Sequence, residues 1–300
     1  MEKRTFRAVF FDLDGTLLPM DVDVFMKSYF RALGGYVARM GIAPDQFMAG
    51  MKRGITAMAT NDSGHANAES FWPEFLACID MPEGVTAETL QAAIGDFYEN
   101  EFGELGADVQ PNPAAARAIE ALVAKGYPLV LATMPMFPRR AVEWRLRWAG
   151  IDPAVFSRIT TFENSTAVKP KPDYYAENLA AAGVEGRDVL MVGNNTKEDL
   201  AACQLGCEGF LVTDFLIDPV GFEVFSVRHG SMEKFADWVD SLPECADPAQ
   251  GVSDAIVPAA VRERVLAACG IADGQAGGAK TLEEAGRTGG TEFVINGMEE

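Results

Sequence analysis

FFDLDGT, residues Phe10–Thr16, is the stretch that decides the fold of this chain of 300 residues. It overlaps an apolar run, Ala8–Phe11, which predicts a short strand buried on both faces, as in a parallel α/β sheet. The run ends in two aspartates, Asp12 and Asp14, and Gly15 lets the chain turn. Taken alone, this pattern is more typical of an Asx-rich turn. However, chemistry in open α/β sheets lies at the carboxyl ends of strands, where a cation such as Mg²⁺ would make two neighbouring carboxylates tolerable.

The composition limits the classes of protein and of partner. With 48% hydrophobic residues the chain can form one large or two modest domains. It contains no apolar run of about 18 residues, the length that a transmembrane helix needs, so no such helix is predicted. The first residues do not resemble a signal peptide, and five cysteines without zinc-ligand spacing indicate reduced thiols, so we expect a cytoplasmic protein. The net charge of −19 argues against nucleic acid and anionic membranes as partners, and an anionic substrate would need local basic groups. We expect a monomer or a homodimer.

Helical spacing replaces the strand pattern directly after the first turn. Apolar residues recur every three or four positions, without the two-residue period of a strand. The predicted helices cover residues 21–40, 45–53, 67–80 and 86–102. We therefore predict an all-helical block at residues 19–107, inserted between core segments 1–18 and 108–243.

The alternation of strands and helices that is typical of a parallel sheet begins after residue 108. Asn112 and Pro113 form an N-cap and a first helical position, and Gly126 ends that helix. Strands are predicted at residues 128–132, 159–162, 188–192 and 209–212, the last being the final core strand. Helices are predicted at residues 113–125, 138–149, 172–182, 197–205 and 231–242. Residues 244–300 are predicted to be an extension that is loose around residues 270–290.

Polar residues follow four of these strands, namely Asp12 and Asp14, Thr133, Lys169, and Asn194 with Asp199. The motifs around them resemble those of the haloacid dehalogenase-like superfamily, whose members are mostly Mg²⁺-dependent phosphatases. Asp12–Thr16 matches the first motif, and Leu129–Thr133, a strand that ends in threonine, matches the second. Lys169–Pro172 is similar to the third motif and Met191–Asp199 to the fourth, where this chain has Asn194 in place of a frequent aspartate. The helical block falls between motifs one and two, where members with a C1-type cap carry their insertion.

The resemblance, which covers about residues 6–242, implies a fold and a set of roles. The fold is α/β, with a Rossmann-like three-layer core, a mainly parallel sheet and an inserted all-helical cap. Asp12 would attack phosphorus to form an aspartyl-phosphate, and Asp14 would protonate the leaving oxygen with a pKa raised by the neighbouring carboxylate. Thr133 would donate its hydroxyl to a phosphate oxygen. Lys169 would neutralise charge between the nucleophile and the phosphoryl group, with Lys171 as its rival.

The implied cofactor is Mg²⁺, held by Asp12, by Asp14 through its backbone carbonyl, by Asn194 and by Asp199. Asn194 can supply an amide oxygen, but it brings one negative charge fewer than aspartate. Asp199 is either a direct ligand or an acceptor that orients the waters of the metal, and Glu198 is an alternative for that task.

We therefore predict a Mg²⁺-dependent phosphatase that hydrolyses a small phosphorylated metabolite. The alternatives are a phosphomutase with the same motifs, a phosphonatase that would need a cap lysine, and a catalytically impaired core that binds a phosphometabolite or a protein. A dehalogenase does not need the second carboxylate, Asp14. Specificity is expected to lie in the cap. Its candidate substrate contacts are the polar loop at residues 60–67 and the basic residues Lys27, Arg31, Arg39, Lys52 and Arg53.

Overall fold

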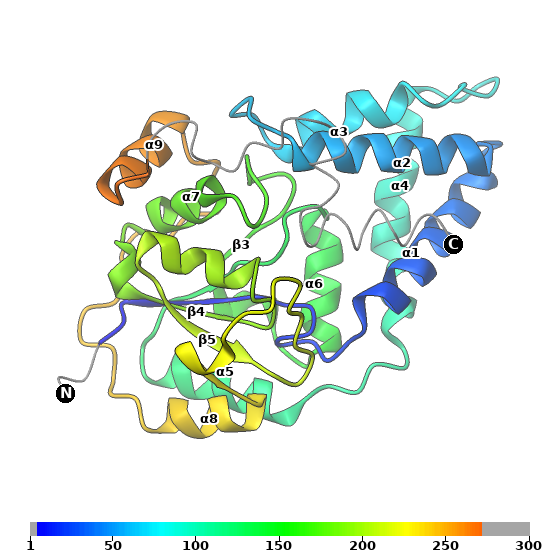
Figure 1. The fold of residues 1–300 in the computed structure, drawn as a ribbon. Helices are drawn as coiled ribbons and strands as arrows, with labels where there is room; N and C mark the ends of the chain where they lie inside the picture. The colour runs from blue at the N-terminus through cyan, green and yellow to red at the C-terminus, as the bar shows by residue number, and fades with distance from the viewer. Residues whose placement is uncertain (1–4, 272–300) are drawn as a thin grey trace.

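A parallel sheet of six strands, in the order β3-β2-β1-β4-β5-β6, lies at the centre of the computed structural model, which describes residues 5–271 (Figure 1). The strands are β1 (Ala8–Phe11), β2 (Leu129–Leu131), β3 (Phe156–Ile159), β4 (Val189–Gly193), β5 (Glu208–Val212) and β6 (Arg228–Gly230). All neighbouring strands pair in parallel, and Val9 of β1 lies opposite Leu129 of β2 and Leu190 of β4. The central strands are apolar at every position because both faces of the sheet are buried.

Helices cover both faces of the sheet and complete three layers (Figure 1). Successive side chains of β1 point to opposite faces, so Val9 and Phe11 belong to one hydrophobic cluster and Ala8 and Phe10 to the other. The first cluster is built with α5 (Pro113–Ala124), α6 (Arg139–Trp148) and α8 (Met232–Asp240), and the second with α7 (Pro172–Ala182), the 3₁₀ helix η4 (Asp199–Leu205) and α9 (Ala259–Ala268). This confirms the predicted Rossmann-like α/β class.

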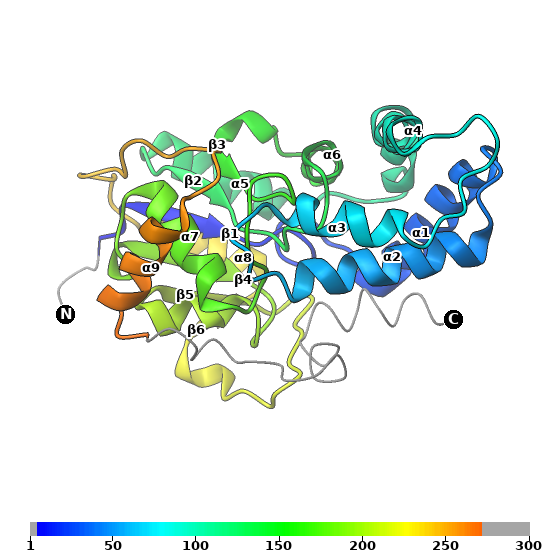
Figure 2. The same ribbon diagram turned by 90° about the horizontal axis from the view of Figure 1, so that it is seen from above.

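The predicted helical insertion consists of α1 (Val22–Ala38), α2 (Pro44–Ala59), α3 (Asn67–Leu76), α4 (Ala87–Asn100) and the 3₁₀ helix η1 (Phe102–Gly106). Seen from above, α1–α4 lie together beyond one end of the sheet (Figure 2). In α1 the buried residues Phe25, Tyr29, Leu33 and Val37 follow one another at four-residue spacing, and they form the inner stripe of the helix. We call α1–α4 the cap helices; residues 19–107 remain our predicted boundaries for the cap.

Three predicted elements differ from the structure, and one helix of the structure was not predicted. The strand expected at 159–162 lies at Phe156–Ile159, and the pattern was misread because Arg158 takes a buried position in it. Residues 199–205 form a 3₁₀ helix instead of the expected α-helix at 197–205. The strand at 209–212 is not the last, because the three-residue strand β6 follows it. Helix α9 has no predicted counterpart, since only Leu266 of it is buried and its apolar pattern is weak.

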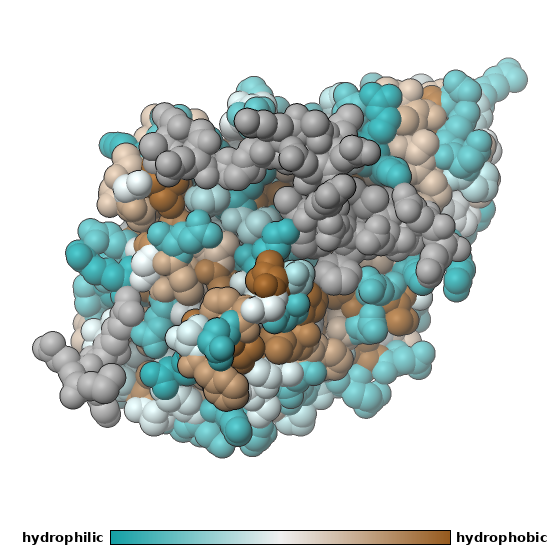
Figure 3. Space-filling model, in the orientation of Figure 1, coloured by the Kyte–Doolittle hydropathy of each residue, from teal (hydrophilic) through white to brown (hydrophobic). Residues whose placement is uncertain are grey.

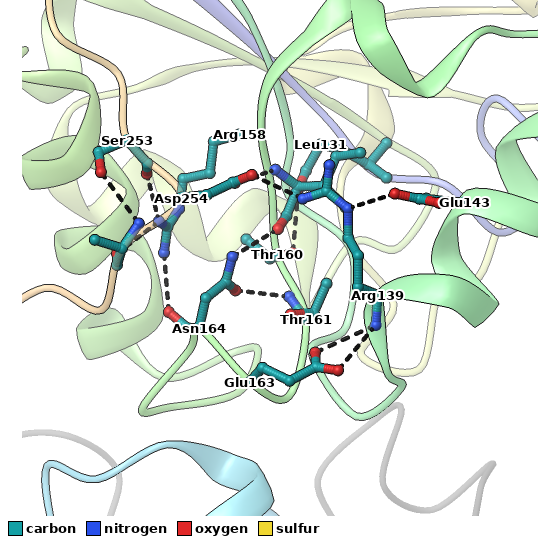
Figure 4. A network of polar contacts seen from close by, with 12 residues as sticks. Leu131, Arg139, Glu143, Arg158, Thr160, Thr161, Glu163, Asn164, Ser253 and Asp254 are labelled. Atoms are coloured by element: carbon teal, nitrogen blue, oxygen red, sulfur yellow. Dashed lines mark hydrogen bonds and ion pairs between the residues drawn. The ribbon is translucent and has the colours of Figure 1, made fainter. Parts of the chain in front are cut away.

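Arg158 also explains how the segment after residue 243 is attached to the sheet (Figure 4). Its buried guanidinium donates to the backbone carbonyls of Ser253 at 2.7 Å and Ala255 at 3.1 Å. Between them, Asp254 forms an ion pair of 2.8 Å with Arg139 of α6. Residues 253–255 are thereby fixed to the end of β3. The remainder of the predicted extension, 272–300, lies outside the described residues.

Two surface properties complete the fold. Within the described range, no helix combines the length and the apolar character that crossing a membrane requires. The segment between β5 and β6 exposes several large apolar side chains, and Figure 3 shows a hydrophobic area over this part of the molecule. They are Phe215, Leu216, Val220 and Phe225.

Candidate active site

Six polar side chains that the sequence predicted lie beyond the carboxyl ends of the strands. We call them the polar floor: Asp12 and Asp14 after β1, Thr133 after β2, Lys169 between β3 and α7, and Asn194 and Asp199 after β4. All but Asp14 are less than one tenth exposed. The structure brings them together, because Asp12, Asp14, Thr133 and Asn194 line one pocket and Lys169 joins Asp12 to Asp199.

Lys169 is the buried cation of the polar floor. Its Nζ lies 2.8 Å from Oδ1 of Asp12 and 2.7 Å from Oδ1 of Asp199. Burial disfavours the ammonium charge, but the two carboxylates raise the pKa of Lys169 well above its usual value. The second oxygen of Asp199, Oδ2, accepts the backbone N–H of Asn195 at 2.9 Å. Both oxygens of Asp199 are therefore engaged within the chain, whereas Oδ2 of Asp12 does not contact Lys169.

The amide of Asn194 is oriented by two contacts. Its Nδ2 donates to the backbone carbonyl of Phe215 at 2.6 Å, and this identifies the nitrogen because a carbonyl only accepts. Its Oδ1 accepts the hydroxyl of Thr16 at 3.0 Å, and that hydroxyl also lies 3.2 Å from Oδ2 of Asp12. A Cβ at residue 15 would lie 2.3 Å from Nδ2, so only glycine, here Gly15 with φ +77°, allows this approach. The amide oxygen of Asn194 and one carboxylate oxygen of Asp12 therefore converge.

This convergence fits a hard divalent cation, which prefers carboxylate and carbonyl oxygens. Within residues 5–271 no group of three or more histidine, cysteine, aspartate or glutamate side chains is placed to hold a metal. A site here must therefore use an amide or backbone oxygen beside the carboxylate. Asp12 and Asn194 are the side chains whose oxygens meet that requirement.

Thr133 is held by its backbone. Its carbonyl accepts the hydroxyls of Thr160 and Tyr174, each at 2.8 Å, and the residue is only 1% exposed. Since both donors are buried, the end of β2 cannot shift without breaking two hydrogen bonds. Thr133 is thus fixed at the wall of the pocket that Asp12 lines.

Asp14 has a partner that the sequence analysis missed. The guanidinium of Arg145, on α6, pairs with Oδ2 of Asp14, and Oδ1 of Asp14 is buried without a hydrogen-bond partner. Burial raises the pKa of Asp14, partly opposed by Arg145 and reinforced by the charge of Asp12. Asp14 therefore holds a proton more tightly than a free aspartate does, beside the nucleophile candidate.

A signal for Arg145 is present in the sequence. On α6 the buried residues are Ala141, Val142, Arg145 and Leu146, which is the spacing of a helix face that packs on a core. A charged residue in such a position requires a buried partner. Three further arginines lie on the same helix, and they mask the one that points inward.

A family model of haloacid dehalogenase-like hydrolases matches residues 6–205, which is two thirds of the chain. The chain belongs to the haloacid dehalogenase-like hydrolase family. No curated protein matches it significantly.

Among solved structures, this hydrolase is similar to CbbY from Rhodobacter sphaeroides in complex with phosphate, at 19% identity and a TM-score of 0.48, over 77% of this chain and 96% of that one. It is also similar to a putative β-phosphoglucomutase from Thermotoga maritima, at 21% identity and a TM-score of 0.47, over 79% of this chain and 100% of that one. The L-2-haloacid dehalogenase RSc1362 is similar at 17% identity and a TM-score of 0.44, over 78% of this chain and 99% of that one.

The cap helices of the hydrolase contribute an apolar wall rather than charges. A pocket lies among α1–α4 and the loop after β2, and it shares Met26, Met136 and Phe137 with the pocket that Asp12 lines. Two tyrosine hydroxyls in it, those of Tyr29 and Tyr98, lie 2.6 Å apart and bond to each other. We call the side chains that line this cavity the apolar wall.

The polar and basic residues that the sequence nominated in the cap lie in two kinds of position. The five basic residues nominated from the sequence are all exposed, and none lines the pocket of Asp12 or the apolar wall. Asn67 and Asn61 are buried, and their amide nitrogens donate to the carbonyls of Ala167 at 3.2 Å and Thr166 at 3.0 Å. Lys171, the rival of Lys169, donates to the carbonyl of Asn61 at 3.0 Å. These residues attach the cap to the core.

Proposed function

We propose that this hydrolase is a Mg²⁺-dependent phosphatase that acts on a small phosphomonoester through an aspartyl-phosphate. The observation that carries the proposal is the second carboxyl group, Asp14, which lines the same pocket as Asp12. An alcohol is a poor leaving group unless it receives a proton, whereas displacement of a halide needs no acid. A phosphonatase would also need a lysine in the pocket, and Lys27 and Lys52 are exposed outside it.

The proposed reaction begins with attack by the carboxylate of Asp12 on phosphorus, which forms the new P–O bond while the ester P–O bond breaks. Lys169 contacts Oδ1 of Asp12 and thereby orients this carboxylate. Asp14 gives its proton to the leaving oxygen, and its raised pKa favours the protonated form that this step needs. The resulting carboxylate then takes a proton from the water that hydrolyses the aspartyl-phosphate. Thr133 donates its hydroxyl to a phosphoryl oxygen.

Asp12, Asn194 and the backbone carbonyl of Asp14 would hold the Mg²⁺, which when bound neutralises charge on the phosphoryl group. We assign Asp199 an indirect role in this site, because its two oxygens already accept from Lys169 and from the backbone of Asn195. It fixes the lysine that orients Asp12, and it fixes the start of the loop that carries Asn194.

The test is release of inorganic phosphate from a panel of phosphomonoesters, with and without Mg²⁺. Turnover that requires Mg²⁺ is expected, and Asp12→Asn should lower kcat by about 10⁴-fold or more, since the nucleophile is removed. Asp108→Asn, at an exposed position, is the matched control and should leave kcat unchanged. No turnover across the panel, with Mg²⁺ bound, would contradict the proposal, and isomerised rather than hydrolysed products would indicate a mutase.

A further inference from the structure

The pocket that Asp12 lines has two chemically different sides. Its polar residues follow strands of the sheet, apart from Arg145 of α6, which pairs with Asp14. Its apolar residues come from α1, from the loop after β2 and from the segment after β5. We call this second set the apolar side of the pocket: Val22, Phe25, Met26, Met134, Met136, Phe137 and Ile217.

The polar groups of this pocket leave little for the recognition of a hydroxylated substrate. Oδ1 of Asn195 already accepts the backbone N–H groups of Lys197 and Glu198, each at 3.0 Å. The charge of Arg145 is balanced by Asp14. In the described part of the chain, the cap helices contribute only α1 to this pocket, through three side chains without a hydroxyl, an amide or a charge. The cap therefore offers apolar surface here, and no side-chain partner for the hydroxyls of a sugar.

The proposed reaction places the leaving group against the apolar side. In an in-line displacement the leaving oxygen lies opposite the attacking oxygen. Asp12 follows a strand of the sheet, whereas the cap helices lie beyond the end of the sheet (Figure 2). A leaving group opposite Asp12 therefore points away from the sheet and toward α1.

We infer that the leaving group is an apolar alcohol, so that the substrates are phosphomonoesters of alkyl or aryl alcohols rather than of sugars. The inference rests on the proposed function, because it takes Asp12 as the nucleophile. A hydroxyl buried against methionine and phenylalanine side chains loses its hydrogen bonds to water, whereas burial of a methylene group there is favourable. A second anionic group is disfavoured as well, because the chain carries a net charge of −19 and Arg145 is already paired.

Release of inorganic phosphate from n-butyl phosphate and from erythritol 4-phosphate, in the presence of Mg²⁺, tests this inference. Both esters have a four-carbon chain, and they differ only in the hydroxyls of the alcohol. The kcat/KM for n-butyl phosphate is expected to be higher by about tenfold or more. Because both are measured on one sample, the fraction of folded enzyme cancels from the ratio. Equal values, or a preference for erythritol 4-phosphate, would overturn the inference.

Two variants test whether the apolar side produces this preference. Met134→Gln adds an amide at a partly exposed position and should lower the ratio by about threefold or more, since the amide can bind a hydroxyl. Val22→Thr adds a hydroxyl from α1 and should lower it in the same direction. Met48→Gln, at a half-buried position of α2 outside both pockets, is the matched control and should keep the ratio. A ratio that neither Met134→Gln nor Val22→Thr changes would overturn the inference.

Binding to the Asp12→Asn variant, measured by titration calorimetry with Mg²⁺, separates this inference from the proposed function. Tighter binding of n-butyl phosphate than of erythritol 4-phosphate, without phosphate release from either ester when Asp12 is intact, supports the apolar side and contradicts the phosphatase. Release from erythritol 4-phosphate at the same or a higher kcat/KM leaves the phosphatase standing and overturns the apolar leaving group.

Discussion

The polar floor and the apolar wall line two pockets that share Met26, Met136 and Phe137, but they are built in opposite ways. In the floor, Lys169 lies within 2.8 Å of two carboxylates, and Asn194 is fixed by two hydrogen bonds, so charges and amides are positioned by the chain itself. In the wall, aromatic and methionine side chains pack against one another, and the two tyrosine hydroxyls form a hydrogen bond with each other. Substitutions in the floor should therefore change the free energy of unfolding through the balance of buried charges. Substitutions around the wall should change it through the packing of side chains.

The largest effect on stability is expected at Lys169. Lys169→Met removes the cation shared by Asp12 and Asp199, and leaving buried charges uncompensated should lower the free energy of unfolding by about 3–5 kcal/mol. Lys171→Met removes one hydrogen bond to a backbone carbonyl and should cost about 1 kcal/mol. Urea denaturation of both variants measures the difference. Equal losses would show that the buried ion pairs contribute nothing specific to the floor.

Glu177 of α7 is a buried carboxyl group that, unlike the carboxylates bound by Lys169, is only partly hydrogen-bonded. Its Oε2 accepts the backbone N–H and the hydroxyl of Thr166, but Oε1 has no partner. Burial raises the pKa of Glu177 to about 7, although the hydrogen bonds from Thr166 lower it. The folded state then binds a proton more tightly than the unfolded state. Its contribution to stability is full below pH 4.5 and is lost as the pH rises through 7.

From pH 5 to pH 8 the free energy of unfolding should therefore fall less for Glu177→Gln than for the native chain. The two falls should differ by roughly 2–3 kcal/mol. Urea denaturation at the two pH values gives the difference, and Glu120→Gln, at an exposed position, is the control. If the native chain and Glu177→Gln show the same pH dependence, Glu177 ionises without a burial penalty.

The smallest effect concerns the packing that supports the wall. A Cβ at Gly54 of α2 would lie 2.4 Å from Cδ2 of Phe71 on α3, so Gly54→Ala should lower the free energy of unfolding by about 1–3 kcal/mol. Gly35→Ala on α1 meets no atom within 4 Å and should raise it by about 0.5–1 kcal/mol, because alanine favours a helix. Opposite shifts in Tm would support close packing of α2 on α3, and a shared direction would contradict it.

The residues of the polar floor stand out in the sequence because few residue types suit such positions, and their catalytic and metal-binding roles stay predictions. Two aspartates after a buried strand, and an asparagine after another, stand out against the apolar runs before them, and the parallel sheet brings the strand ends together. Arg145 and Arg158 were missed for different reasons. Arg158 interrupts the apolar pattern of its strand, whereas Arg145 lies on a helix that was predicted but carries three further arginines.

The use of the cap residues could not be predicted from the sequence. Asn61 and Asn67 have the composition of a loop that contacts substrate, yet their amides bind backbone carbonyls of the core. Helix α9 could not be predicted either, because only Leu266 of it is buried and its sequence therefore has almost no periodic apolar pattern. Residue type alone does not tell a ligand contact from a contact between segments.

The hydrogen bond from Asn194 to Phe215 has a consequence for how this site can change. An aspartate at residue 194 would add a negative charge for a metal, but it cannot donate, so one of its oxygens would face the carbonyl that now lies 2.6 Å from the amide nitrogen. This single substitution would place a carboxylate oxygen beside the carbonyl of Phe215, and the two acceptors would repel each other. The hydrogen bond that now fixes the chain after β5 would be lost. Asparagine and the path of residues 213–217 are therefore a matched pair, and a change in the charge of the site requires a second change in that loop.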